Sequence, residues 1–160
     1  MLSDSLNVPV GLILNAVGGS PCESWIDRRT LEFNYPGILN NWTKNDRIQD
    51  WVRERASLNI KKSDTSQQRH PYEPCYLFES GIIPLASYPV KGVIWYQGES
   101  NAHNKEIHEI LFPLLVDSWR KNWNKEFPFY YVQLSGLNRP SWPHFRDSQR
   151  RLAYILTGGG

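Results

Sequence analysis

The chain carries the run Val93-Ile94-Trp95-Tyr96-Gln97-Gly98-Glu99-Ser100-Asn101, in which apolar residues pass directly into polar residues around a glycine. A short apolar run that ends at a turn signal predicts a buried strand, here at residues 90–97. Ligands bind beyond the carboxyl ends of the strands in open α/β sheets. The side chains of Gln97, Glu99, Ser100 and Asn101 would lie at such an end. The run therefore predicts both a sheet and a site.

Two other apolar runs predict strands, at residues 8–17 and 127–134. Hydrophobic spacing predicts helices at 46–58, 107–119 and 145–156, and a short one around 78–85. Pro113 should kink the second of these helices or mark its first turn. Polar, aperiodic segments at 59–71 and 135–144 are expected to be loops. Such alternation of strands and helices indicates a parallel sheet with helices on both faces. Because three strands make a small sheet, we expect the central part of a larger fold.

Composition and charge narrow the classes of function. The 160 residues are 40% apolar and 21% charged, as in a globular domain with its own core. A formal net charge of +2 is too small to indicate nucleic acid binding. No stretch of 18 apolar residues predicts a membrane span. Met1-Leu2-Ser3-Asp4-Ser5 lacks the basic and apolar regions of a signal peptide. The sequence thus favours a partner that is neither nucleic acid nor membrane.

Cysteines, histidines and aromatic residues leave several interpretations open. Cys22 and Cys75 form no Cys-x-x-Cys pair, so they are either a disulfide or two buried thiols. The histidines (His70, His103, His108 and His144) show no metal-binding spacing, and no phosphate loop occurs, so no metal or cofactor is expected. Seven Trp and eight Tyr residues either fill the core or line a cleft for sugar rings.

Three predicted strand ends carry candidate site residues. Gly18 and Gly19, followed by Ser20, would let backbone N–H groups approach a ligand, or would simply form a tight turn. Gln97 would donate a hydrogen bond to an oxyanion, and Glu99 would orient a histidine or fix the loop. Alternatively, Glu99 caps the next helix and Asn101 forms an Asx turn. The third strand end contributes Gln133, with Arg146 beyond it, or these residues only satisfy the polar groups of a loop.

The motifs together resemble the sialate O-acetylesterase family, a branch of the SGNH hydrolases. The most specific of them is Trp95-Tyr96-Gln97-Gly98-Glu99-Ser100-Asn101. The others are Val10-Gly11-Leu12-Ile13 running to Gly18-Gly19-Ser20-Pro21 with Trp25, Leu77-Phe78, Ile83-Pro84-Leu85, Asp117-Ser118-Trp119-Arg120, Phe127-Pro128-Phe129 with Gln133, and Arg146-Asp147-Ser148-Gln149.

The resemblance implies a flavodoxin-like α/β three-layer sandwich with a parallel sheet, of the SGNH hydrolase type and incomplete in this chain. It implies a serine esterase that removes O-acetyl groups from sugars such as sialic acid, without a cofactor. Gly19 with Gly18 would give backbone donors to the oxyanion, and Gln97 would give a side-chain donor. Glu99 would support the loop. Ser20, Asn101, Gln133 and Arg146 would contact the substrate.

The chain departs from the family pattern at two positions. It has no Gly-Gln-Ser motif for the nucleophile and no Asp-x-x-His motif for the base. We therefore expect residues 1–157 to be the central part of the esterase domain, inactive alone, and residues 158–160 to be a tail without structural role. A homo-oligomer would cover the sheet edges and helix faces left open. The family implies a periplasmic, extracellular or lysosomal parent protein.

Two other functions are consistent with the sequence. One is a non-catalytic carbohydrate-binding module whose Trp-rich loops hold a glycan. The other is a short esterase in which Ser20 is the nucleophile and His144 the base.

Overall fold

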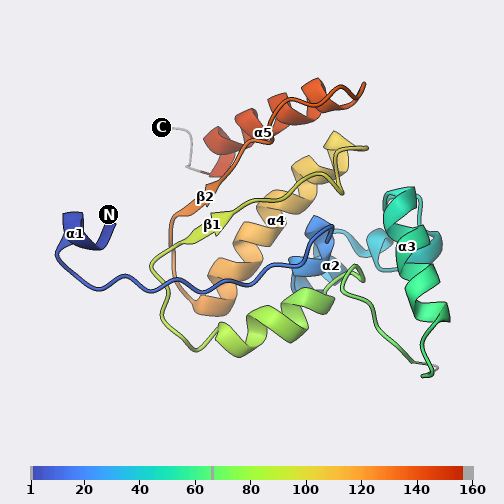
Figure 1. Cartoon of the computed structure of the whole chain (residues 1–160), viewed down its shortest axis with the longest axis horizontal. Helices are drawn as coiled ribbons and strands as arrows, with labels where there is room; N and C mark the ends of the chain where they lie inside the picture. The colour runs from blue at the N-terminus through green and yellow to red at the C-terminus, as the bar shows by residue number, and fades with distance from the viewer. Residues whose placement is uncertain (1, 66, 157–160) are drawn as a thin grey trace.

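The computed structural model describes residues 2–65 and 67–156 (Figure 1). Its α-helices are α1 Leu2–Leu6, α2 Arg28–Asn34, α3 Asp50–Lys61, α4 Lys105–Trp123 and α5 Trp142–Leu156. Its strands are β1 Val93–Trp95 and β2 Phe129–Tyr131. Single helical turns lie at Cys22–Trp25, Pro36–Ile38, Trp42–Lys44, Phe78–Ile82 and Ile83–Leu85.

The two strands form a parallel pair joined by α4. Val93 pairs with Phe129, Ile94 with Tyr130 and Trp95 with Tyr131. A parallel pair needs a crossover connection, and the 19-residue helix α4 provides it. This β–α–β unit confirms the parallel sheet predicted from the sequence.

One face of the sheet is covered and the other is open in the described part of the chain. The Trp95 ring contacts Trp25 and Trp119 edge to face, at centroid distances of 5.9 Å each, and Phe112 at 6.5 Å. Since side chains alternate along a strand, Ile94 points to the opposite face and is 79% exposed. The chain is therefore an α/β structure with a small parallel sheet. The third layer of the expected sandwich is not present among the described residues.

The predicted strand at residues 8–17 is wrong for the structure. The segment joins no sheet, and Leu12 and Leu14 are 87% and 92% exposed. An apolar run becomes a strand only where a neighbouring strand completes its hydrogen bonds, and β1 pairs with β2 alone. The segment is anchored near its end, where the Asn15 amide donates to the Gly81 carbonyl at 2.9 Å.

The predicted helices are confirmed, with shifted ends. α4 begins at Lys105 because the Asn104 side chain accepts a hydrogen bond from the Ile107 N–H at 3.0 Å. Pro113 lies inside α4 and does not mark its first turn. α3 begins at Asp50 and extends into the segment predicted as a loop. α2 was not predicted, although Asp27 caps it by accepting from the Thr30 N–H at 2.9 Å.

Most of the aromatic residues belong to the core. Trp25, Trp95 and Trp119 are buried in the main core, and Trp42, Trp51 and Trp123 are partly buried against it. Trp142 is buried in a second, smaller cluster. The core interpretation of the Trp residues is therefore confirmed. No helix in the described residues is long and apolar enough to cross a membrane. The predicted tail, residues 158–160, lies outside the described residues.

Candidate active site

A tight turn follows the extended segment at residues 17–20. The Ser20 N–H and Ser20 Oγ both donate to the Val17 carbonyl, at 3.2 and 2.7 Å. Gly19 has a φ of 77°, and a Cβ atom there would lie 2.5 Å from the Tyr72 hydroxyl oxygen. That hydroxyl donates to the Gly18 carbonyl at 3.0 Å. Only glycine fits Gly19, both for its backbone angle and for the close approach of Tyr72.

The loop after β1 begins with a second constrained glycine. Gly98 has a φ of 154°, and a Cβ atom would lie 2.8 Å from Cε1 of Phe145 on α5. The Asn101 N–H donates to the Gly98 carbonyl at 2.9 Å and closes the loop. The Ser100 hydroxyl donates to the Gly19 carbonyl at 2.8 Å. The two glycine-containing segments are therefore in direct contact, although only the second of them follows a strand.

Side-chain amides connect these two segments. Gln97 Nε2 donates to Asn101 Oδ1 at 2.7 Å and to the Ser20 carbonyl at 3.3 Å. Asn101 Oδ1 also accepts from the backbone N–H of Cys22 at 2.9 Å. Gln97 Oε1 is buried and has no partner in the described part of the chain. Gln97 thus lies between the turn and the loop with both of its N–H groups directed at protein oxygens.

A buried carboxyl group that the sequence did not single out completes this network. Glu23 is 1% exposed, and its Oε2 accepts from Asn101 Nδ2 at 2.9 Å. Burial raises the pKa of Glu23 to about 7, although hydrogen bonds from its own backbone and from Asn101 lower it. The pattern Pro21-Cys22-Glu23-Ser24-Trp25 contains the residue, but nothing local in a sequence reveals that a lone Glu is buried.

Backbone N–H groups remain open at the turn. Gly18 and Gly19 are exposed, and no hydrogen bond in the described part of the chain uses their N–H groups. Glu99, by contrast, is exposed and makes no hydrogen bond or ion pair with the residues that the structure describes. The open N–H groups lie one and two residues before Ser20, whose carbonyl Gln97 contacts. The open backbone donors therefore lie close to the Gln97 amide, whose own N–H groups are bound to protein oxygens.

Gln133 and Arg146 form hydrogen bonds with backbone carbonyls beside each other, and neither residue contacts the amide network. Gln133 Nε2 donates to the Arg146 carbonyl, and Arg146 Nε donates to the Leu134 carbonyl, both at 2.7 Å. Gln149, which the sequence analysis mentioned only within a motif, links both strand ends. Its Oε1 accepts from the Leu134 N–H at 3.0 Å, and its Nε2 donates to the Gln97 carbonyl at 3.3 Å.

The described residues do not pair Ser20 with a histidine. Ser20 Oγ is engaged by the Val17 carbonyl and accepts from Trp25 Nε1 at 2.9 Å. His144 is exposed on α5, and His103 Nε2 lies 3.3 Å from the Arg47 carbonyl oxygen. Since a nucleophilic serine needs a base within hydrogen-bond reach, this geometry gives no support to the Ser20–His144 esterase.

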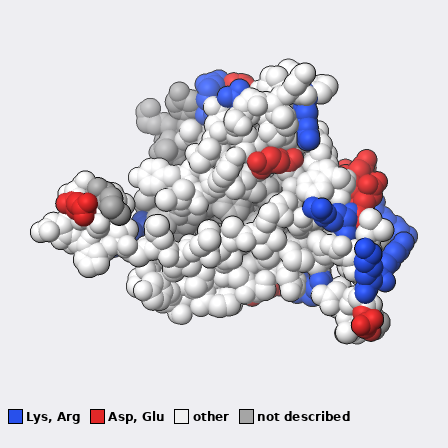
Figure 2. Space-filling model, in the orientation of Figure 1, with Lys and Arg blue, Asp and Glu red and all other residues white. Residues whose placement is uncertain are grey.

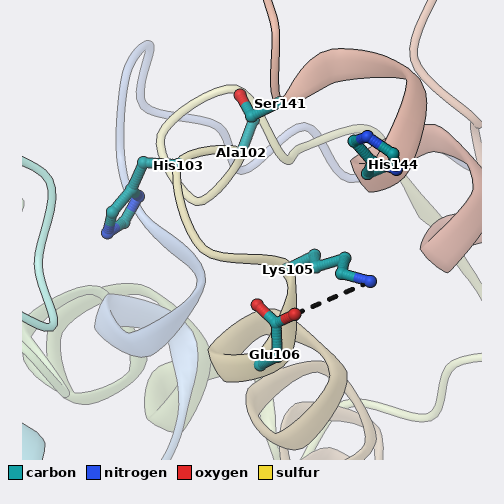
Figure 3. Close-up of a pocket in the computed structure, with 6 residues that line it drawn as sticks. All are labelled: Ala102, His103, Lys105, Glu106, Ser141 and His144. Atoms are coloured by element: carbon teal, nitrogen blue, oxygen red, sulfur yellow. Dashed lines mark ion pairs between the residues drawn. The ribbon is translucent and has the colours of Figure 1, made fainter.

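A surface pocket adjoins the loop immediately after Asn101 (Figure 3). It has a volume of about 320 Å³ and is lined by Ala102, His103, Lys105, Glu106, Ser141 and His144. Lys105 and Glu106 form an ion pair at 3.6 Å, drawn as a dashed line in Figure 3. The pocket offers both charged groups and hydroxyl or imidazole groups, which suits a polar ligand.

In the described residues, the cysteines form no disulfide, and no cluster of potential ligands forms a metal site. Cys22 and Cys75 are both buried and free. Burial raises the pKa of the Cys22 thiol well above its usual value and that of Cys75 to about 12. No group of three or more His, Cys, Asp or Glu side chains in the described ranges could hold a metal ion.

The chain is an α/β protein in which the loop after β1 meets the glycine turn at residues 17–20 through a network of side-chain amides. The family model described as carbohydrate esterase, sialic acid-specific acetylesterase, matches residues 1–157. The chain belongs to this family of carbohydrate esterases.

Named relatives agree with that assignment. The chain is 32% identical over 152 residues to a mouse protein, 31% over 153 residues to a rat protein and 32% over 143 residues to a human protein, each named sialate O-acetylesterase. The matches cover 84% of this chain but 27%, 28% and 23% of those proteins. The chain therefore spans about a quarter of the length of these relatives. No solved structure is a significant match.

Proposed function

We propose that this chain forms the oxyanion-binding half of an esterase site that removes O-acetyl groups from carbohydrates. The observation that carries the proposal is the contact between the Gly18–Ser20 turn and Gln97. Membership of the carbohydrate esterase family supplies the reaction class. Similarity to proteins named sialate O-acetylesterase supports an O-acetylated sugar such as sialic acid as the substrate.

In the proposed reaction, a serine attacks the acetyl carbonyl and a histidine takes the serine proton. The carbonyl oxygen gains negative charge in the tetrahedral intermediate and needs hydrogen-bond donors. The open N–H groups of Gly18 and Gly19 supply backbone donors. Gln97 Nε2 supplies a third when it releases the Ser20 carbonyl, the longer of its two bonds at 3.3 Å. Its 2.7 Å bond to Asn101 holds the amide in place meanwhile.

The serine and the histidine are proposed to lie outside residues 1–157. The sequence contains no Gly-Gln-Ser and no Asp-x-x-His motif, and Ser20 Oγ is occupied by Val17 and Trp25. In the described part of the chain β1 pairs only with β2, and its other edge would accept the strand that brings the serine. The substrate sugar is proposed to reach the pocket beside Ala102. Substrate contacts by Gln133 and Arg146, and a supporting role of Glu99 in the loop, stay predictions from the sequence.

Acetate release by the full-length gene product tests this function. We expect it to release acetate from O-acetylated sialic acid and to react with a fluorophosphonate at a serine outside these 160 residues. The 160-residue chain alone should release no acetate above background. A fluorophosphonate adduct on Ser20 would overturn the proposed division of the site. Glycan binding without any acetate release by the full-length product would favour the non-catalytic module.

A further inference from the structure

Glu23 connects to Gln97 through a single residue. Its carboxyl oxygen Oε2 lies 2.9 Å from Asn101 Nδ2, and Asn101 Oδ1 lies 2.7 Å from Gln97 Nε2. Glu23 and Asn101 are 1% and 3% exposed. Two segments distant in the sequence contribute to this chain of contacts, the turn that carries Glu23 and the loop that carries Gln97 and Asn101.

The direction of the contacts follows from donor and acceptor chemistry. An asparagine amide has a donor end and an acceptor end of nearly equal shape. An ionised carboxylate can only accept, so Glu23 selects the Nδ2 end of Asn101. The Cys22 N–H can only donate, so it selects the Oδ1 end. With Asn101 oriented in this way, Gln97 must present its Nε2 to Asn101, and its Oε1 faces away without a partner.

We propose that Glu23 is a positioning residue that orients Gln97 through Asn101, so that the Gln97 N–H groups face the turn that binds the oxyanion. The inference rests on the proposed function for its catalytic meaning, but the relay itself is a property of the folded chain. Glu23 does not touch the substrate; it acts on the donor that does.

The two cysteines nearest Glu23 are neutral near pH 7, and the charged groups of the neighbouring turn are paired with one another. Cys22 on the same turn and Cys75, whose N–H donates to the Glu23 carbonyl at 3.0 Å, both have raised pKa values. On α4, Ser118 Oγ accepts from the Asp27 N–H and Trp119 Nε1 donates to the Trp25 carbonyl. Neither side chain carries a charge. The Glu79 carboxylate of the neighbouring turn is paired with Arg28 and Arg69.

The charge state of Glu23 should therefore change the hydrogen bonding of the Gln97 side chain. A hydrogen bond to an ionised acceptor is stronger than one to a neutral acceptor. The pKa of about 7 means that Glu23 changes its charge within an accessible pH range. Protonation of Glu23 should weaken its hydrogen bond with Asn101 Nδ2. Through Asn101, it should also change the chemical environment of Gln97 Nε2.

Side-chain amide signals in ¹⁵N–¹H NMR spectra of the 160-residue chain test the relay without any activity measurement. Between pH 5 and pH 9, the Asn101 and Gln97 side-chain amide signals should shift with one common midpoint near pH 7. Glu23→Gln should abolish that titration and shift both signals at every pH. Glu54→Gln, which makes the same change at an exposed position on α3, should leave both unchanged.

Two results would overturn the proposal. One is a wild-type Gln97 amide signal that stays constant while Asn101 titrates, a result that needs no variant to fold. The other is a Gln97 titration that persists in Glu23→Gln, which would assign it to another group. A shared titration in a chain whose full-length product releases no acetate would refute the esterase proposal and leave the relay standing.

Discussion

At the residue scale, Asn101 is the central residue of the candidate site because both ends of its amide are hydrogen-bonded, one to a carboxyl group and the other to two N–H donors. Glu23 takes its donor end, while Cys22 and Gln97 use its acceptor end. Sequence analysis identified Gln97 and Asn101 because they follow an apolar strand. It did not identify Glu23, since the burial of a single carboxyl group depends on segments about 50 and 80 residues away in the chain.

Glu23 should make the stability of the chain depend on pH in a specific direction. Its pKa in the folded state is about 7, above its ordinary value of 4.5, so the folded state binds the proton more tightly. The resulting stability is fully present below pH 4.5 and is lost as the pH rises through 7. Relative to Glu23→Gln, the wild type should lose up to about 3 kcal/mol between pH 4.5 and pH 8. Urea denaturation at several pH values measures this. A difference independent of pH would contradict the raised pKa.

At the element scale, the β1–α4–β2 unit could be predicted from sequence and the segment at 8–17 could not. α4 has a hydrophobic face, the Asn104 cap and a length that a crossover needs, all of which are local signals. The apolar run at 8–17 carries the same signal as a strand, but its state depends on a neighbouring strand. α2 was missed because seven residues give too short a period to recognise.

Gly98 should not tolerate a side chain, because it lies in the loop after β1 and packs closely against Phe145 on α5. Gly98→Ala would place a Cβ atom 2.8 Å from Phe145 at a φ of 154°. We expect a loss of about 2 kcal/mol or more in the free energy of unfolding, from steric overlap and backbone strain. Gly136→Ala is the matched control, since nothing lies within 4 Å of its Cβ position. Equal stability of the two variants in urea would show that α5 does not pack against this loop.

His108 should destabilise the contact between α4 and α5 when the pH is lowered. Its ring lies between Phe112 and Phe145, at centroid distances of 5.6 and 4.7 Å. Burial lowers its pKa to about 4, so its contribution to stability is present above pH 6.5 and is lost as the pH falls toward 4. Lowering the pH from 8 to 5 should destabilise the wild type by about 2 kcal/mol relative to His108→Leu.

The same substitution at an exposed histidine controls for general effects of histidine charge. His144→Leu removes the exposed imidazole at the start of α5 and should show no such pH-dependent difference from the wild type. If His108→Leu and the wild type lose stability equally between pH 8 and pH 5, the ring is not buried in its neutral form.

At the scale of the whole molecule, apolar surface lies open on one side of the sheet. Ile94, Tyr96 and Tyr130 are exposed, as are Leu12 and Leu14 of the unpaired segment. Figure 2 shows that charged side chains lie mainly toward the margins of the face in view, while its middle is largely uncharged. Exposed apolar surface of this kind marks an interaction site in soluble proteins. A second copy or a further part of the polypeptide remains our proposal for what covers it.

Hydrogen exchange should separate the unpaired segment from the core. Among the described residues, no backbone hydrogen bond involves an N–H between residues 9 and 16, so these amides should exchange at nearly the rate of an unfolded peptide. The amides in the middle of α4 should be the slowest. Strong protection within residues 9–16 would mean that the segment pairs with a strand in solution, and that the sheet is larger than the two strands described.

The most direct test of the central claim is the turnover number of the full-length gene product on a chromogenic acetyl ester, with and without Gln97. If Gln97 and the Gly18–Ser20 turn bind the oxyanion, Gln97→Ala should lower the turnover number by about 10²–10³ with little change in KM. An exposed amide at another position, Gln68→Ala, serves as the control and should change neither. A Gln97→Ala enzyme that retains its turnover number within a factor of two or three would contradict the claim.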